Sequence, residues 1–448
     1  MRFSRSRLGS AATGIATLVV AAAAVTTSLQ SGGAATPTPQ AGIPTPTGSP
    51  VTAPSVTHLT LPTKPSEPST STPVATPWAT PATVSYVNPA SVSFPTAADG
   101  WVLGDGCDAQ GACEVVMART TDDGANWTLV SPPVDPRQSA WGLQVLAGSA
   151  QDAWVWGYEG QGSGPAVFVA THDGGATWEP IDTGSAVVTS LALGGGTVWA
   201  VTGCPSGTSG CAAHLLSSST NGGPWTDVGP LPLVTTVEPP SSVLFPRTEL
   251  VRAGGRAWVL VTAGGVGGGW GLVRSDDSGS TWTHLSVPCE GRMAPLAMAA
   301  SSPTALMLMC GIGGAWPAPQ EIWGSADGGS SWQLRSRSSA ILLQPPLPSV
   351  GHLESQGLPT GLVMLDAQTA WIWGDREQDM VTRDGGVSWT APSQLPYDNA
   401  GGAEGLGFSD PLHGWTFGSD GLWTTADGGR TWRYTPIFGP VPGFPHPG

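Results

Sequence analysis

The sequence is poor in charge and almost lacks lysine. Asp, Glu, Lys and Arg together make up 11% of its 448 residues, and Lys64 is the single lysine. The formal net charge is −15. Binding to nucleic acid requires a basic stripe, and the sequence has none. Nucleic acid is therefore excluded as an expected partner, and so is long-range attraction to anionic lipid.

Long helices are not expected either, because helix-disfavouring residues are abundant. The chain contains 63 Gly and 43 Pro, close to a quarter of all residues. Disorder along the whole chain is nevertheless excluded, since 40% of residues are hydrophobic and 21 are Trp. Tryptophan buries a large area and needs a hydrogen-bond partner, so it favours packed cores. This composition predicts an all-β protein of short strands and tight turns.

Residues 1–30 are expected to be a signal peptide or an N-terminal membrane anchor. Arg2, Arg5 and Arg7 precede the uncharged stretch 8–29, whose apolar centre covers 15–25. This centre has the length of a secretory signal and is shorter than the ~20 residues that span a bilayer. Small residues at 22–24 and 33–35 are possible cleavage sites.

Residues 31–83 are predicted to form a disordered linker rich in Thr, Pro, Ser and Ala. The segment has few large apolar side chains, so burial cannot offset the entropy lost on ordering. Two interpretations stay open, a solvated spacer and an O-glycosylated stalk. Residues 441–448 are taken as a C-terminal tail.

From about residue 84 an eight-residue phrase, called the Asp turn below, recurs seven times. Its pattern is Ser/Thr-x-Asp-x-Gly-x-x-Trp, and the third copy has Thr in place of Asp. The third positions are Asp122, Asp173, Thr220, Asp277, Asp327, Asp384 and Asp427, and the closing residues are Trp127, Trp178, Trp225, Trp282, Trp332, Trp389 and Trp432. Successive third positions are 43 to 57 residues apart.

A second phrase, called the strand phrase below, precedes each Asp turn. It is a short apolar stretch built around an aromatic residue and usually closed by Gly, as in Gly100-Trp101-Val-Leu-Gly104. The fifth copy, which begins at Ala305, lacks the tryptophan. Two phrases in a fixed order seven times indicate a repeat architecture.

The Asp turn has the chemistry of a tight connection between two strands. Its Asp carboxylate can accept backbone N–H bonds, its Gly tolerates a positive φ, and its Trp begins the next strand. A repeat of this length accommodates four strands of five or six residues. One such sheet cannot bury both faces, so the repeats must pack side by side, most simply as a closed ring.

The Asp turn resembles the Asp-box, or bacterial neuraminidase repeat, of sialidases, sortilin-type receptors, xyloglucan-cleaving glycosidases and photosystem II assembly-factor propellers. Together with the strand phrase it is most similar to the assembly-factor type. The resemblance covers about residues 84–440. It implies a single seven-bladed β-propeller of four-stranded antiparallel blades, in which the Asp boxes are structural turns between the third and fourth strands.

Six cysteines predict disulfides and an oxidising compartment. Cys107 and Cys113 flank the connection after the first strand phrase, and Cys204 and Cys211 flank the equivalent connection in the third repeat. Cys310 follows the fifth strand phrase, with Cys289 as its expected partner. Equivalent placement suggests cross-strand disulfides in a secreted or cell-envelope protein of bacterial type. Zinc is the competing interpretation, but the spacings match no usual zinc site and no metal or cofactor is expected.

The residues expected of an enzyme are not found in the sequence. The sialidase resemblance would imply an arginine triad, a Tyr nucleophile with a Glu partner, and an Asp acid, yet none of the 4 Tyr lies in such a setting. Phe245-Pro246-Arg247 has the wrong residue order and lies mid-chain. A sialidase-like glycosidase with a non-standard site and a photosystem II assembly factor remain the alternative functions.

The expected function is binding or assembly through loops at one face of a monomeric ring. The connections between second and third strands should lie opposite the Asp turns. Candidate binding residues there are Tyr158, Glu159, Trp270, Trp316, Asp375, Arg376, Glu377 and Asp379. The expected partner is a protein or glycan, and the N-terminal segment is a possible membrane tether.

Overall fold

The computed structural model describes residues 83–130, 133–137, 139–159, 165–203, 212–233, 247–262, 270–290, 293–312, 319–338, 350–353, 358–375, 379–392 and 403–442. The expected signal segment, nearly all of the linker and most of the tail lie outside these residues. Within them, no helix is long and apolar enough to cross a membrane.

The fold is a seven-bladed β-propeller, as the repeats predict, and each blade is one sheet of strands that are contiguous in sequence and antiparallel, apart from one added strand in blade 5. Blade 1 comprises β1 (Tyr86–Ser93), β2 (Gly100–Cys107), β3 (Cys113–Thr120) and β4 (Thr128–Val130), and blade 2 comprises β5 (Leu143–Ala147), β6 (Ala153–Tyr158), β7 (Ala166–Thr171) and β8 (Glu179–Pro180). Blade 3 comprises β9 (Val187–Gly194), β10 (Thr197–Gly203), β11 (His214–Ser219) and β12 (Thr226–Pro230). Blade 4 comprises β13 (Arg247–Ala253), β14 (Arg256–Thr262), β15 (Trp270–Ser275) and β16 (Thr283–Leu285).

Two of the remaining blades depart from the expected four strands. Blade 5 comprises β17 (Ala294–Ala300), β18 (Leu306–Gly311), β19 (Gln320–Ser325), β20 (Gln333–Ser338) and β21 (Gly351–Leu353). Blade 6 comprises β22 (Leu358–Met364), β23 (Ala370–Asp375) and β24 (Met380–Thr382). Blade 7 comprises β25 (Gly405–Phe408), β26 (Gly414–Gly418), β27 (Gly421–Thr425) and β28 (Arg433–Tyr434). In blade 5, β21 adds a fifth, parallel strand to the edge of β20. In blade 6 the fourth strand is reduced to a single bridge between Val381 and Thr390.

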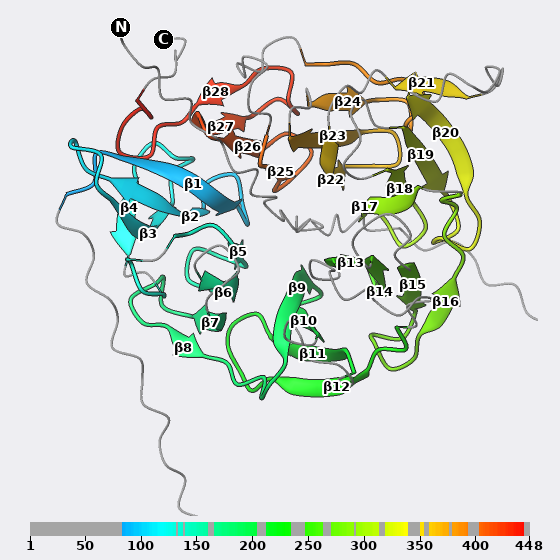
Figure 1. Cartoon of the computed structure of the whole chain (residues 1–448), viewed down its shortest axis with the longest axis horizontal. Helices are drawn as coiled ribbons and strands as arrows, with labels where there is room; N and C mark the ends of the chain where they lie inside the picture. Colours follow the sequence, from blue (N-terminus) through cyan, green and yellow to red (C-terminus); the bar gives the residue numbers. More distant parts are fainter. Residues whose placement is uncertain are drawn as a thin grey trace, which may run out of the picture. The chain divides into compact units, whose positions relative to one another are not determined.

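The blades follow one another around the ring in sequence order (Figure 1). The first strand of each blade is innermost (Figure 1), and the first strands of most successive blades contact one another, as in β1 with β5 and β9 with β13. The ring is closed by contacts of β1 with β25, β26 and β27. Every strand phrase forms a second strand, and every Asp turn follows a third strand.

Seven clusters of buried side chains lie between consecutive blades, one at each interface. Each cluster joins the strand phrase of one blade to the Asp-turn tryptophan of the next blade. Trp101 and Trp178 meet in this way with ring centroids 6.3 Å apart, and Trp371 and Trp432 with centroids 5.8 Å apart. The two phrases therefore recur together because they form one contact across each interface.

The Asp-turn glycine has a second role besides its backbone conformation. Gly429 has a φ of 76°, in the left-handed region that favours glycine. A Cβ on Gly429 would lie 2.2 Å from Trp371 of the preceding blade, closer than any real contact. Glycine is thus required here for both the turn and the close approach of two blades.

Polar side chains of the innermost strands bind backbone N–H groups of the next blade. Ser91 Oγ accepts a hydrogen bond from Val145 N at 3.0 Å. Ser190 Oγ accepts from Leu250 N at 3.0 Å, and Glu249 Oε2 accepts from Met298 N at 2.8 Å. An innermost strand has one edge without a strand partner, and an unpaired buried N–H is costly. These side chains therefore supply hydrogen-bond acceptors for N–H groups on that unpaired edge.

The seam between blades 7 and 1 is closed by the segment that follows the last strand. Ile437 is 2% exposed and joins the cluster that contains Val87 of β1 and Trp415 of β26. Arg433 donates to the Asp123 carbonyl oxygen at 3.0 Å and lies 3.2 Å from its carboxylate. Among the described residues no strand is exchanged between the two blades, so side-chain packing and the contacts of Arg433 with Asp123 close the ring.

Candidate functional site

The six Asp turns that contain aspartate share one hydrogen-bond pattern. The Ser or Thr hydroxyl donates to Asp Oδ1 at 2.8–2.9 Å and accepts from the Gly N–H at 2.8–3.1 Å. The residue four positions after Asp donates its backbone N–H to Oδ1 and its side chain to Oδ2, the latter at 2.5–2.7 Å. Both carboxylate oxygens are thus engaged within the turn.

These hydrogen bonds also hold the aspartates in the charged form. Donation from the Ser331 side chain, then from its backbone N–H and from the Ser325 hydroxyl, lowers the pKa of Asp327 to about 2. The pKa of Asp122 is lowered mainly by the Asn126 side chain. A general acid near neutral pH needs a raised pKa, so these carboxylates are suited to structure and not to proton transfer.

The third Asp turn lacks both parts of this pattern. Thr220 occupies the aspartate position, and Pro224 occupies the position that elsewhere supplies two donors. Proline has no backbone N–H and no side-chain donor. Here Ser218 Oγ donates instead to the Gly223 carbonyl oxygen at 3.0 Å. The turn that lacks the aspartate therefore also lacks the residue that would donate hydrogen bonds to it. The sequence pattern alone shows only that this copy departs from the other six.

An aspartate at position 220 should stabilise the fold only when position 224 also carries a residue that can donate hydrogen bonds to it. We expect Thr220→Asp alone to change the free energy of unfolding by less than about 0.5 kcal/mol. Combining it with Pro224→Thr should give a favourable coupling on the order of 1 kcal/mol. Urea unfolding of the two single variants and the double variant measures the coupling, with Asp173→Thr as a destabilised control. Additive effects would contradict this account.

Further donors at this end of the ring, called the Asp-turn end below, bind carbonyl groups of a neighbouring blade. Trp258 Nε1 and an Arg274 guanidinium nitrogen each donate to the Gly328 carbonyl oxygen at 3.0 Å. Arg119 donates to Ala150 O at 2.9 Å, and Arg383 donates to Gly428 O at 3.3 Å. These cations hold blades together and are not free to grip an anionic substrate.

Two hollows of about 200 Å³ lie at the Asp-turn end. One lies at the seam, and its lining comprises Asp123, Thr424, Thr425, Ala426, Thr431, Trp432 and Arg433. Typical small-molecule sites enclose about 300–1,000 Å³, so each hollow is small for a drug-sized ligand. In the described part of the chain, no group of three or more His, Cys, Asp and Glu residues is arranged to hold a metal.

Two buried carboxylates outside the Asp turns have well-defined partners. Glu249, 6% exposed, accepts the Met298 N–H bond described above. Glu321, 2% exposed, accepts from Arg337 Nε at 2.7 Å and from Trp323 Nε1 at 3.1 Å. They lie in blades 4 and 5, and each carboxylate is engaged by donors of the fold, whereas ordinary glycoside hydrolysis uses two carboxylates that face the sugar.

The opposite end of the ring, called the loop end below, carries the connections between second and third strands. Their lengths vary from two residues, 419–420, to ten residues, 204–213. The Asp turns, by contrast, span six or seven residues in every blade that has a fourth strand. Length thus varies more among these connections than among the Asp turns, although the connections between first and second strands, at the Asp-turn end, also range from two residues, 195–196, to six residues, 94–99.

The structure places the described candidate residues at the loop end but in blades that are not neighbours. Tyr158 ends β6 in blade 2, Trp270 begins β15 in blade 4, and Asp375 ends β23 in blade 6. Glu159 follows Tyr158 and donates its N–H to Pro165 O at 3.1 Å. Asp379 is only 1% exposed, so its side chain is not presented to a partner. Trp316, Arg376 and Glu377 lie outside the described residues.

Two disulfides are present in the described residues, Cys107–Cys113 and Cys289–Cys310. The first joins directly paired residues of β2 and β3, as a cross-strand bond. The second is not cross-strand, because Cys289 lies in the connection between β16 and β17, and it ties blade 4 to β18 of blade 5. Cys204 and Cys211 lie outside the described residues. Disulfides of this kind are typical of an oxidising compartment.

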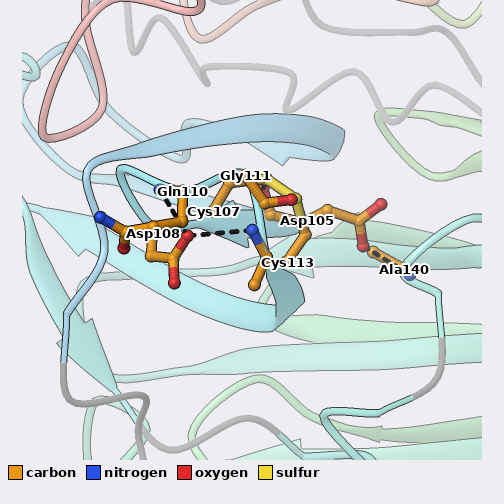
Figure 2. Close-up of a disulfide and its surroundings, with 8 residues drawn as sticks. Asp105, Cys107, Asp108, Gln110, Gly111, Cys113 and Ala140 are labelled. Carbon is orange, nitrogen blue, oxygen red and sulfur yellow. Dashed lines mark hydrogen bonds between the residues drawn. A yellow bond between two sulfur atoms is a disulfide. The ribbon is translucent and has the colours of Figure 1, made fainter.

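The first loop of the loop end, residues 108–112, is a compact turn (Figure 2). Asp108 Oδ1 accepts hydrogen bonds from the backbone N–H groups of Gln110 at 2.8 Å and Ala112 at 2.9 Å. Beside it, burial raises the pKa of Asp105, although the carboxylate accepts an opposing hydrogen bond from Ala140 N at 3.1 Å. Sequence reasoning missed Asp105, whose only signal is its place at the end of a strand phrase.

Comparisons with known proteins add the following likenesses. No family model matches the chain, and no curated protein matches its sequence. A solved structure titled YCF48 bound to D1 peptide has a TM-score of 0.49 and 15% identity, covering 77% of this chain and 94% of that one. YCF48 from Cyanidioschyzon merolae has a TM-score of 0.48 and 15% identity over 78% and 97%. A PL25 ulvan lyase has a TM-score of 0.38 and 13% identity over 64% and 77%. Likenesses this distant carry no argument about function.

Proposed function

We propose that the chain is a non-catalytic, extracytoplasmic binding or assembly module, secreted or held at the cell envelope. Its loop end would contact a protein or a glycan. The observation that carries this proposal is the contrast between the two ends of the ring. The Asp turns are nearly uniform in length, and their carboxylates and the neighbouring arginines are engaged in holding the fold. The loop end varies in length from blade to blade, as binding surfaces on rigid scaffolds do.

Several features of the described residues support binding over catalysis. The six turn carboxylates lie in six different blades, and each is hydrogen-bonded within its own turn. Their pKa values are lowered where a shift is resolved, as at Asp327. The two disulfides fit a chain that works outside the reducing cytosol.

A photo-crosslinking experiment tests which end binds. A photoreactive amino acid is placed in the full chain at Gln110 or Ala166, at the loop end, or at the exposed Ala125 or Ala176, at the Asp-turn end. We expect one discrete cross-linked partner, protein or glycan, from the loop-end positions on cells of the source organism. The Asp-turn positions in the same two blades serve as matched controls. Cross-links from the controls alone would reject the loop end as the binding face.

A panel of fluorogenic glycosides tests the catalytic alternative. We expect no turnover by the purified chain. Turnover that is abolished by Arg376→Ala or Glu377→Ala would instead make the loop end an active site and overturn the non-catalytic proposal.

A further inference from the structure

The two described disulfides differ in where they lie and in what they hold together. Cys289 and Cys310 are 6% and 0% exposed and join two blades. Cys107 is 3% exposed, but Cys113 is exposed to solvent at the loop end. Thiol–disulfide exchange begins with attack on an accessible sulfur, and of the two described bonds only Cys107–Cys113 includes a solvent-exposed cysteine.

The hairpin that carries Cys107 and Cys113 is held by other interactions along its whole length. β2 and β3 are in continuous register from Gly100 opposite Thr120 to Cys107 opposite Cys113. The turn between them is closed by the bonds to Asp108 Oδ1 and by Asp108 N donating to Ala112 O at 2.9 Å. The disulfide is therefore redundant for the hairpin, and opening it leaves the blade folded.

Both sulfur atoms already face acceptors suited to a thiol. Cys107 Sγ lies 3.7 Å from the Asp105 carbonyl oxygen, and Cys113 Sγ lies 3.6 Å from the Gly111 carbonyl oxygen (Figure 2). A thiol S–H is a weak donor, and once the bond is cleaved and the two sulfur atoms move apart, these neighbouring carbonyl groups can accept from it. The reduced form therefore has hydrogen-bond acceptors close to both cysteines.

We propose that Cys107–Cys113 is a reversible thiol–disulfide exchange site for a dithiol reductant, while Cys289–Cys310 is a permanent link. A thiolate of the reductant attacks Cys113 Sγ, the bond between the two cysteines breaks, and Cys107 leaves as a thiolate that takes a proton from water. The second thiol of the reductant then attacks the reductant sulfur atom of the mixed disulfide. Cys113 leaves as a thiolate, which also takes a proton from water. The dithiol is oxidised by two electrons to a disulfide, and the protein disulfide is reduced to two thiols. This proposal stands whether or not the loop end binds a partner.

Selective reduction of the folded full chain tests the proposal. The protein is equilibrated in buffers of reduced and oxidised dithiothreitol, quenched with an alkylating reagent, and the four cysteines are quantified by peptide mass spectrometry. We expect half-reduction of Cys107–Cys113 at a ratio of reduced to oxidised reagent at least tenfold below that for Cys289–Cys310, a difference of about 30 mV. In the folded chain Cys289–Cys310 should stay oxidised at the reagent ratios that half-reduce Cys107–Cys113.

Single-cysteine variants provide a matched control for accessibility. Cys107→Ser leaves the exposed Cys113 thiol, whereas Cys113→Ser leaves the buried Cys107 thiol at the same site. We expect the first variant to react with an aromatic disulfide probe at least tenfold faster in native buffer. The double variant Cys107→Ser/Cys113→Ser should keep a cooperative thermal transition. Simultaneous reduction of both disulfides, equal reactivity of the two thiols, or loss of cooperativity in the double variant would each overturn the proposal.

Discussion

Trp258→Ala is expected to lower the free energy of unfolding by about 3–5 kcal/mol. The indole is fully buried between blades 4 and 5, and its Nε1 donates to Gly328 O in the next Asp turn. Truncation removes this contact across the interface and leaves a cavity that a ring of seven sheets cannot close locally. Urea unfolding followed by fluorescence measures the loss.

We expect the loss of stability to depend more on the buried volume of the Trp258 side chain than on its hydrogen bond to Gly328 O. In Trp258→Phe the aromatic volume is largely kept, and Gly328 O still accepts from Arg274. We expect a loss of about 1–2 kcal/mol in this control. Equal losses in the two variants would show that the indole N–H, and not packing, determines stability at this interface.

Ile437→Ala is expected to cost about 2–5 kcal/mol, although Ile437 lies beyond the last strand. Its side chain is 2% exposed and packs at the seam with residues of β1 and β26. The described strands are not exchanged across the seam, so the loss of one buried side chain there weakens ring closure directly.

The neighbouring Phe438 is the matched control, because it is 40% exposed. Phe438→Ala should change the free energy of unfolding by less than about 0.5 kcal/mol. Hydrogen exchange should show the Ile437→Ala variant opening first at β1 and β26. Comparable effects of the two substitutions would contradict the role of this segment in closing the ring.

The sequence predicts the blade count and the second and third strands well, because both phrases are local. Asp327 and its turn partners lie within eight residues of one another, so spacing alone predicts the connection. The pairing of Trp101 with Trp178 was not predicted, because it joins residues of different repeats. The extra strand β21 was missed because its segment carries neither phrase.

The candidate site was less predictable than the fold. Topology alone places Tyr158 and Trp270 at the loop end, since successive connections alternate between the two ends of a blade. Whether such residues meet depends on which blades carry them, and these two lie in non-adjacent blades. The burial of Asp379 and the hydrogen bond of Ser91 to the next blade depend on neighbours distant in sequence, and no local pattern reports them.

Because each blade uses one uninterrupted stretch of chain, its hydrogen bonds can form as soon as its last strand has been synthesised. Folding can therefore proceed blade by blade from the N-terminus while the chain is still emerging, with mainly local pairings at each step. The exception is the junction of the first and last blades, which must wait for residues 435–442. A nascent chain that lacks blade 7 and residues 435–442 would thus be an open arc, in which the apolar face of the first blade that blade 7 and Ile437 later cover is exposed.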